Sequence, residues 1–115
     1  MKVLLLLSIG LFLAPFADGQ EKKEQVRKDR ILIVNIESQS ISFFTRCGEQ
    51  SFGERQTLEP HEKAEFRCRD GFEILIRTHL PNEKPQEVLR SLEEESRNAL
   101  FWDSENRRYD CRRVD

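Results

Sequence analysis

Three cysteines and two histidines are the residues of this chain whose chemistry is most versatile. Cys47, Cys68 and Cys111 carry thiols, and His61 and His79 carry imidazoles. Neither histidine stands at ligand spacing from a cysteine or from the other histidine, so the pattern does not predict a zinc site. A cysteine nucleophile would need a free thiol of depressed pKa beside a histidine, and a bridged cysteine is excluded from that role. We therefore expect no metal, no cofactor and no enzyme activity.

A group of arginines around a tyrosine is the clearest candidate for binding. Basic and aromatic side chains together can hold a sulfated sugar or an acidic patch on a receptor. Acidic residues interleave with these positions, so a plain soluble tail is the alternative interpretation. The candidate partner-binding residues are Arg107, Arg108, Tyr109, Arg112 and Arg113.

The first 19 residues have the pattern of a secretory signal peptide. Met1 and Lys2 form a short basic start, residues 3–16 are almost continuously apolar, and Ala17 and Gly19 are small. The apolar run is shorter than the roughly 20 residues of a membrane-spanning helix. We therefore expect residues 1–19 to be removed, the chain to be secreted, and no membrane insertion after cleavage.

Length and charge limit what the rest of the chain can be. Removing 19 residues from 115 leaves 96, which suits one small domain. The chain has 19 Lys and Arg against 21 Asp and Glu, and this balance gives no indication of nucleic-acid binding. Residues 20–30 hold one apolar residue in eleven and are predicted to be a disordered polar arm. Residues 31–115 are then a single small secreted domain.

Alternating apolar and polar residues predict a domain that is mainly β. Residues 31–36 form a β-branched run and residues 41–47 alternate, so the two segments are predicted to pair as a hairpin. A second hairpin is predicted from residues 64–68 and 72–76. The loop between them would place Gly71 in the left-handed conformation, which sets the apolar faces of both strands together.

Residues 83–99 change to a helical period, with Asn82 available as a cap. The helical stripe consists of Val88, Leu89, Leu92, Ser96 and Ala99. Residues 100–102 are predicted to form a last buried strand, and residues 103–115 a polar tail. The predicted fold is therefore a small antiparallel sheet or sandwich with one amphipathic α-helix packed on it.

Two of the three cysteines are expected to pair in an oxidising compartment. If the strands run alternately up and down, Cys47 ends the second strand and Cys68 ends the fourth at the same end of the sheet. We therefore predict a disulfide between Cys47 and Cys68, worth about 3 kcal/mol in the chain-entropy model. Cys111 would be the odd thiol in a polar tail, open to a bridge with a second chain that gives a dimer.

Several short segments share a pattern with one family of secreted proteins. They are Ile-Val-Asn-Ile at 33–36, Ile-Ser-Phe-Phe-Thr-Arg-Cys at 41–47, Ser-Phe-Gly at 51–53, Leu58, Ala-Glu-Phe at 64–66 and the aromatic and cysteine segment at 100–111. These segments resemble plant self-incompatibility S1-type proteins. The chain departs from that pattern because Cys68 comes early, residues 83–99 have no counterpart and a closing Cys-x-Trp is absent. The resemblance implies a small β-sandwich that acts through its loops as a secreted ligand or effector, without enzyme activity.

These observations together predict a secreted, non-enzymatic binding protein. It would present loops 48–53 and 59–62 to an extracellular or cell-surface protein, because loops on a rigid scaffold commonly carry binding residues. The alternative from another class is a secreted protease inhibitor in which the exposed turn at 57–62 enters a protease cleft. A small hydrolase has the least support.

Overall fold

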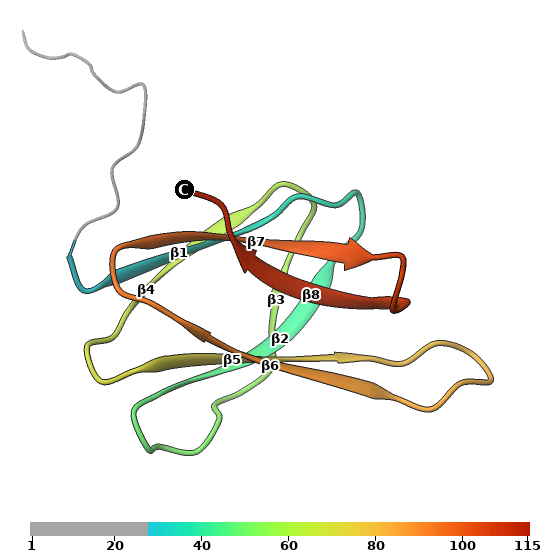
Figure 1. The fold of residues 1–115 in the computed structure, drawn as a ribbon, viewed down its shortest axis with the longest axis horizontal. Helices are drawn as coiled ribbons and strands as arrows, with labels where there is room; N and C mark the ends of the chain where they lie inside the picture. Colours follow the sequence, from blue (N-terminus) through green and yellow to red (C-terminus); the bar gives the residue numbers. More distant parts are fainter. Residues whose placement is uncertain (1–27) are drawn as a thin grey trace, which may run out of the picture.

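The computed structural model describes residues 28–115, which form two four-stranded β-sheets packed face to face (Figure 1). The strands are β1 (Arg30–Asn35), β2 (Ile41–Cys47), β3 (Gln56–Leu58), β4 (Lys63–Arg67), β5 (Phe72–Thr78), β6 (Gln86–Leu92), β7 (Ser96–Asp103) and β8 (Arg108–Arg113). The first sheet has the order β4-β1-β7-β8, and the second sheet has the order β3-β2-β5-β6. The predicted signal peptide and most of the predicted arm lie outside the described residues.

Both predicted hairpins are wrong, although their strands are present. β1 and β2 lie in different sheets, and so do β4 and β5. β1 pairs instead with β4 and, in parallel, with β7, whereas β2 pairs with β3 and β5. Asn35 explains the first crossing, because its side-chain amide donates to the carbonyl oxygens of Gln39 at 2.8 Å and Leu58 at 3.0 Å. These bonds turn the chain over the end of the sandwich and into the second sheet.

The helix predicted over residues 83–99 is also wrong, because β6 and the start of β7 occupy this segment. β6 pairs with β5 from Phe72 opposite Leu92 to Thr78 opposite Gln86. Val88 and Leu92 face the core. Residues four apart lie on the same face of a strand and also on the same face of a helix, so this spacing alone does not distinguish the two. The described residues contain no helix, and therefore none that is long and apolar enough to cross a membrane.

The polar tail predicted over residues 103–115 contains an ordered strand. β8 pairs with β7 over six positions, among them Leu100 opposite Cys111 and Trp102 opposite Tyr109. Asp110 and Cys111 are buried at 6% and 4% exposure. Burial of Cys111 means that a bridge from this thiol to a second chain requires β8 to move away from the core.

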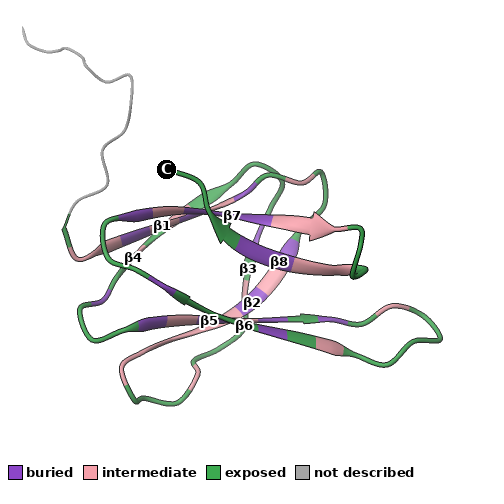
Figure 2. Cartoon of the chain, viewed as in Figure 1, coloured by how far each residue is buried: buried purple, intermediate pink, exposed green. Residues whose placement is uncertain are grey.

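One apolar core fills the space between the sheets, and the buried positions follow the strands that face it (Figure 2). Its largest side chains come from both sheets and are at most 1% exposed: Ile31, Ile33, Phe43, Ile74, Ile76 and Leu100. Burial of such a side chain stabilises the fold by about 1.5–3 kcal/mol. The predicted alternation of residues 41–47 is confirmed over residues 41–44, where Ile41 and Phe43 are buried and Ser42 and Phe44 are partly exposed, whereas residues 45–47 are all partly exposed.

The strand directions give the sandwich two ends. At one end, β2 finishes and β1 and β7 begin, and we call this the disulfide end because Cys47 and Cys68 meet there. Its connections are residues 48–55, 68–71 and 93–95. The connections at the other end, which we call the opposite end, are residues 36–40, 59–62, 79–85 and 104–107.

Candidate functional site

The disulfide between Cys47 and Cys68 joins the two sheets at one end of the sandwich. The Cα atoms of the two cysteines are 5.8 Å apart, and the predicted pairing is confirmed. The strand directions behind the prediction are also present, but β2 and β4 belong to different sheets. Beside the disulfide, the Gly48 N–H donates to the carbonyl oxygen of Gly71 at 2.8 Å. The loop after β2 and the loop before β5 are therefore fixed to each other.

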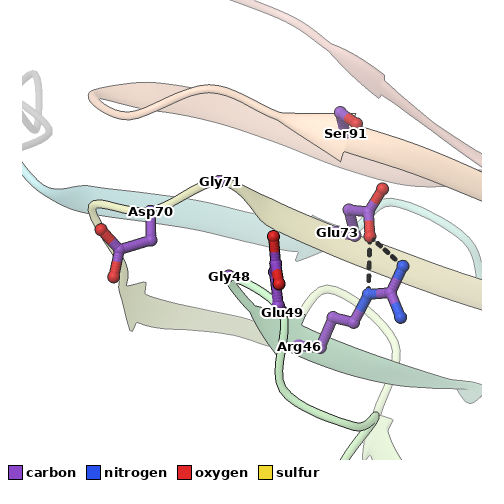
Figure 3. Close-up of a pocket in the computed structure, with 7 residues that line it drawn as sticks. All are labelled: Arg46, Gly48, Glu49, Asp70, Gly71, Glu73 and Ser91. Carbon is purple, nitrogen blue, oxygen red and sulfur yellow. Dashed lines mark hydrogen bonds and ion pairs between the residues drawn. The ribbon is translucent and has the colours of Figure 1, made fainter.

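A polar hollow of about 460 Å³ lies between these loops and the ends of β5 and β6 (Figure 3). We call it the acidic hollow, and its lining consists of Arg46, Gly48, Glu49, Asp70, Gly71, Glu73 and Ser91. Gly48 has a positive φ of 69°, and a Cβ atom there would lie 3.3 Å from the Cβ of Asp70. A side chain at position 48 would therefore strain the backbone and crowd the hollow.

One guanidinium and three carboxylates set the charge of the acidic hollow. Arg46 and Glu73 are cross-strand neighbours, and the Arg46 Nε donates to Glu73 Oε1 at 2.6 Å. The Arg46 guanidinium also lies 4.5 Å from the centroid of the Phe52 ring, so its charge is already engaged. Within residues 28–115, the carboxylates of Glu49 and Asp70 have no ion-pair partner. The hollow therefore keeps an excess of negative charge.

The chemistry available in the acidic hollow is binding by charge and hydrogen bonds. Its one hydroxyl belongs to Ser91, and no histidine lines the hollow to act as a base. Among the described residues, no group of three or more His, Cys, Asp and Glu side chains is placed to hold a metal ion. The arrangement suits recognition of a cationic group by Glu49 and Asp70.

The arginines predicted to bind a partner lie on β8 and the preceding turn, and they already contact other side chains. Arg107 pairs with Glu83 at 2.6 Å, and the Arg112 guanidinium lies 4.6 Å from the centroid of the Phe101 ring. Arg113 pairs with two carboxylates. Successive residues of a strand point to opposite faces of the sheet, so these side chains do not form one patch. Their role in binding stays a prediction.

Tyr109 and Arg108 are the two remaining members of that predicted group. Tyr109 packs against the core and meets Trp102 edge to face, with 4.9 Å between ring centroids. Arg108 is partly buried, and its Nε has no hydrogen-bond partner in the described part of the chain. Tyr109 therefore lies at the opposite end of the sandwich, close to the turn that carries Arg107.

The two loops predicted to bind a partner lie at different ends of the molecule. Loop 48–53 borders the acidic hollow, whereas residues 59–62 lie beside Asn35, whose carbonyl oxygen accepts the His61 N–H at 2.8 Å. The seven residues of β5, which connects the two ends, span about 23 Å at about 3.3 Å per residue. One small epitope therefore does not reach both loops.

The turn at 57–62 does not favour the protease-inhibitor alternative. Leu58 is 5% exposed, and the Glu59 N–H donates to the side chain of Glu62 at 2.8 Å. His61 has a positive φ of 65°. Residues 57 and 59–62 are exposed, but the turn is closed on itself, whereas a peptide that binds by main-chain pairing is extended.

Sequence reasoning missed Arg46, Glu49, Asp70 and Glu73 as neighbours. Arg46 and Glu73 both stand on the polar side of their alternating strands, so a pairing of β2 with β5 would have brought them together. The predicted pairing of β4 with β5 hid this contact. Comparisons of the chain with protein-family models, curated proteins and solved structures gave no match.

Proposed function

We propose that this chain is a secreted, non-enzymatic binding protein whose acidic hollow accepts a lysine or arginine side chain of an extracellular or cell-surface protein. The observation that carries the proposal is a pair of carboxylates, Glu49 and Asp70, which have no ion-pair partner among residues 28–115 and stand on two loops fixed by the disulfide and by the Gly48–Gly71 hydrogen bond. Secretion is supported by the signal-like residues 1–19 and by the disulfide, which persists in oxidising compartments.

An apolar row beside the acidic hollow supports a protein as the partner. The row crosses the outer face of the second sheet and consists of Phe44, Leu75 and Leu89, which are cross-strand neighbours. Leu89 is 49% exposed, and the adjacent row of the same face contains Arg46 and Glu73. Protein interfaces combine apolar contacts with a polar rim in this manner. A free inorganic cation would leave the apolar row uncovered.

The two carboxylates and the apolar row contribute to partner binding in different ways. Glu49 and Asp70 are exposed, so each ion pair with a partner contributes about 0–1 kcal/mol after screening by water. Burial of the apolar row adds a favourable contribution of about 25 cal/mol for each Å² of apolar surface that the partner covers. The carboxylates select a basic partner and speed its association.

The two-sheet fold also supports the resemblance to S1-type proteins, which implies a β-sandwich acting through its loops.

A capture experiment with a matched control tests the proposal. The purified protein, the double variant Glu49→Gln/Asp70→Asn and the variant Glu54→Gln are each immobilised and exposed to extracellular fluid. Glu54 is the control because it is exposed on the same loop and does not line the acidic hollow. We expect the wild type and Glu54→Gln to retain the same basic protein, and the double variant to retain at least about fivefold less.

Measurements of the salt dependence of capture and of substrate turnover complete this experiment. Retention by the wild type should fall between about 0.1 M and 1 M salt, because the Debye length shortens from about 10 Å to 3 Å. Equal capture by all three proteins, or the absence of any specific capture, contradicts binding at the acidic hollow. Turnover of a peptide, ester or glycan by the purified protein contradicts the non-enzymatic part of the proposal.

A further inference from the structure

A second hollow, at the opposite end of the sandwich, is lined by aromatic rings. Its volume is about 340 Å³, and its lining consists of Glu37, Ser38, Gln39, Leu80, Trp102 and Tyr109. We call it the aromatic hollow. The β7–β8 turn and the β5–β6 loop project at this end, away from the disulfide (Figure 1). The aromatic hollow shares no residue with the acidic hollow, and its size lies at the low end of small-ligand pockets.

The apolar wall of the aromatic hollow is held in place by both of its strands. Trp102 on β7 and Tyr109 on β8 are cross-strand partners, and their rings meet at an interplanar angle of 71°. The Tyr109 N–H donates to Thr78 Oγ1 at 2.9 Å, and its hydroxyl donates to Gln39 Oε1 at 3.1 Å. Leu80 adds a third apolar side chain from the β5–β6 loop. The two rings therefore have fixed orientations before any ligand arrives.

The polar side of the aromatic hollow carries one fixed carboxylate. Glu37 Oε2 accepts the backbone N–H of Trp102 at 2.8 Å, and the Glu37 N–H donates to Asn35 Oδ1 at 2.8 Å. The first bond holds the side chain at the rim and the second fixes the Glu37 backbone, while the other carboxylate oxygen is left for a ligand. None of the lining residues carries a positive charge, so the lining has a formal charge of −1 from Glu37.

We propose that the aromatic hollow binds an organic cation, an alkylated ammonium group, between the Trp102 and Tyr109 rings and the Glu37 carboxylate. Aromatic faces attract cations through the ring quadrupole, and tryptophan is the strongest of the three aromatic side chains in this respect. A neutral ligand of the same shape gains the apolar contact but not the attraction to Glu37. An anion is repelled by the carboxylate. The cation can be a free quaternary amine or a methylated lysine of a protein, since both present the same chemistry.

The single tryptophan of the chain makes this proposal directly measurable, because Trp102 lines the aromatic hollow. The purified protein is titrated with choline, with a short peptide containing trimethyl-lysine, and with 3,3-dimethylbutan-1-ol, the neutral carbon analogue of choline. We expect a saturable change in Trp102 fluorescence with at least one cation and about fivefold or more weaker binding of the neutral alcohol. Choline binding indicates a small-molecule source, and preference for the peptide indicates a protein source.

Two variants assign the binding to Glu37. Glu37→Gln keeps an oxygen to accept the Trp102 N–H but removes the charge, so cation affinity should fall about fivefold. Glu94→Gln removes a charge from the exposed connection 93–95 at the disulfide end, apart from the aromatic hollow, and should bind as the wild type does. Equal binding of cation and neutral alcohol by the wild type, no response to either cation, or unchanged affinity in Glu37→Gln overturns the proposal.

The titration can refute cation binding at the aromatic hollow without refuting partner binding at the acidic hollow. The variant Glu49→Gln/Asp70→Asn changes residues at the disulfide end only, so it should bind choline or the peptide with wild-type affinity. Loss of cation binding in that variant contradicts a site at Trp102. The indole N–H signal of Trp102 in an NMR spectrum provides a second measurement, and it also reports whether Glu37→Gln is folded.

Discussion

Breaking the Cys47–Cys68 disulfide should destabilise the protein and disturb the acidic hollow most. The cysteines are 21 residues apart, and the chain-entropy model gives about 3 kcal/mol for a cross-link that closes a loop of this length. Cys68 is 4% exposed within the core, and Cys47 packs against the same cluster. Removing both sulfurs therefore adds a packing loss of about 1 kcal/mol. The expected total is about 4 kcal/mol.

Urea unfolding of the wild type and of Cys47→Ala/Cys68→Ala measures this loss. The free energy of unfolding should fall by about 4 kcal/mol, which lowers the urea midpoint by about 1–4 M at typical m-values. The m-value should rise, because the unfolded chain without its cross-link exposes more surface. Cys111→Ala is the matched control, since it removes a buried sulfur but no cross-link, and its m-value should equal that of the wild type.

Hydrogen exchange locates the effect within the molecule. The Gly48 amide, which donates to Gly71, should lose more protection than the Tyr109 amide, which donates to Thr78 at the opposite end. A loss of stability below about 1 kcal/mol with an unchanged m-value would refute the entropic reasoning. Equal loss of protection at both ends would refute the claim that the disulfide organises the acidic hollow.

Three further predictions concern buried polar groups. Burial raises the pKa of the Cys111 thiol to about 12, so a maleimide at pH 8 should label it only after unfolding in urea; complete labelling of the folded protein contradicts its burial. Burial alone would raise the pKa of Asp110, but hydrogen bonds from Arg90 and from the Cys111 N–H hold it below its ordinary value. Its contribution to stability is therefore present above about pH 4 and lost as the pH falls through the lowered pKa. Asp110→Asn should lower the free energy of unfolding by about 1–2 kcal/mol at pH 7, a modest value because Arg90 is 45% exposed, and by almost nothing at pH 2. Thermal unfolding at both pH values measures this difference, and an equal loss at both contradicts the pairing. Asn35 is 0% exposed and donates to backbone carbonyl oxygens, so Asn35→Asp places a carboxylate against these oxygens. The variant should lower the free energy of unfolding in urea by about 3 kcal/mol or more, and an unchanged free energy contradicts this hydrogen-bond network.

Local patterns predicted the strands that alternate clearly and failed where two periods coincide. Residues 41–47 and 72–78 alternate with a period of two, and the burial in the structure follows this alternation over residues 41–44 and 72–78. Residues 88 and 92 are four apart, and this spacing satisfies both a helical turn and an even step along a strand, whereas residue 96 fits the helical stripe but begins the next strand. β5 decides between them, because it offers β6 a ladder of seven paired positions that a helix cannot use.

Sheet membership and the acidic hollow depend on contacts between distant segments. The parallel pairing of β1 with β7 joins Ile31 to Ser96, and no local pattern encodes that choice. The disulfide was predictable because it required only the directions of the strands and not their partners. The hollow required the β2–β5 partnership itself, which places Arg46 against Glu73. Cys111 was misplaced because the polar residues around it concealed a strand in which Asp110 and Cys111 are both buried.

NMR mapping of the captured partner on the isotope-labelled protein tests binding at the acidic hollow most directly. The partner retained by the wild type is added to the labelled protein, and backbone amide shifts are followed along the chain. We expect the largest changes at Gly48, Glu49, Asp70 and Gly71, with smaller changes at Leu89 on the adjacent apolar row. Changes confined to the opposite end of the sandwich, or no changes at these amides at saturation, would contradict a binding site at the disulfide end.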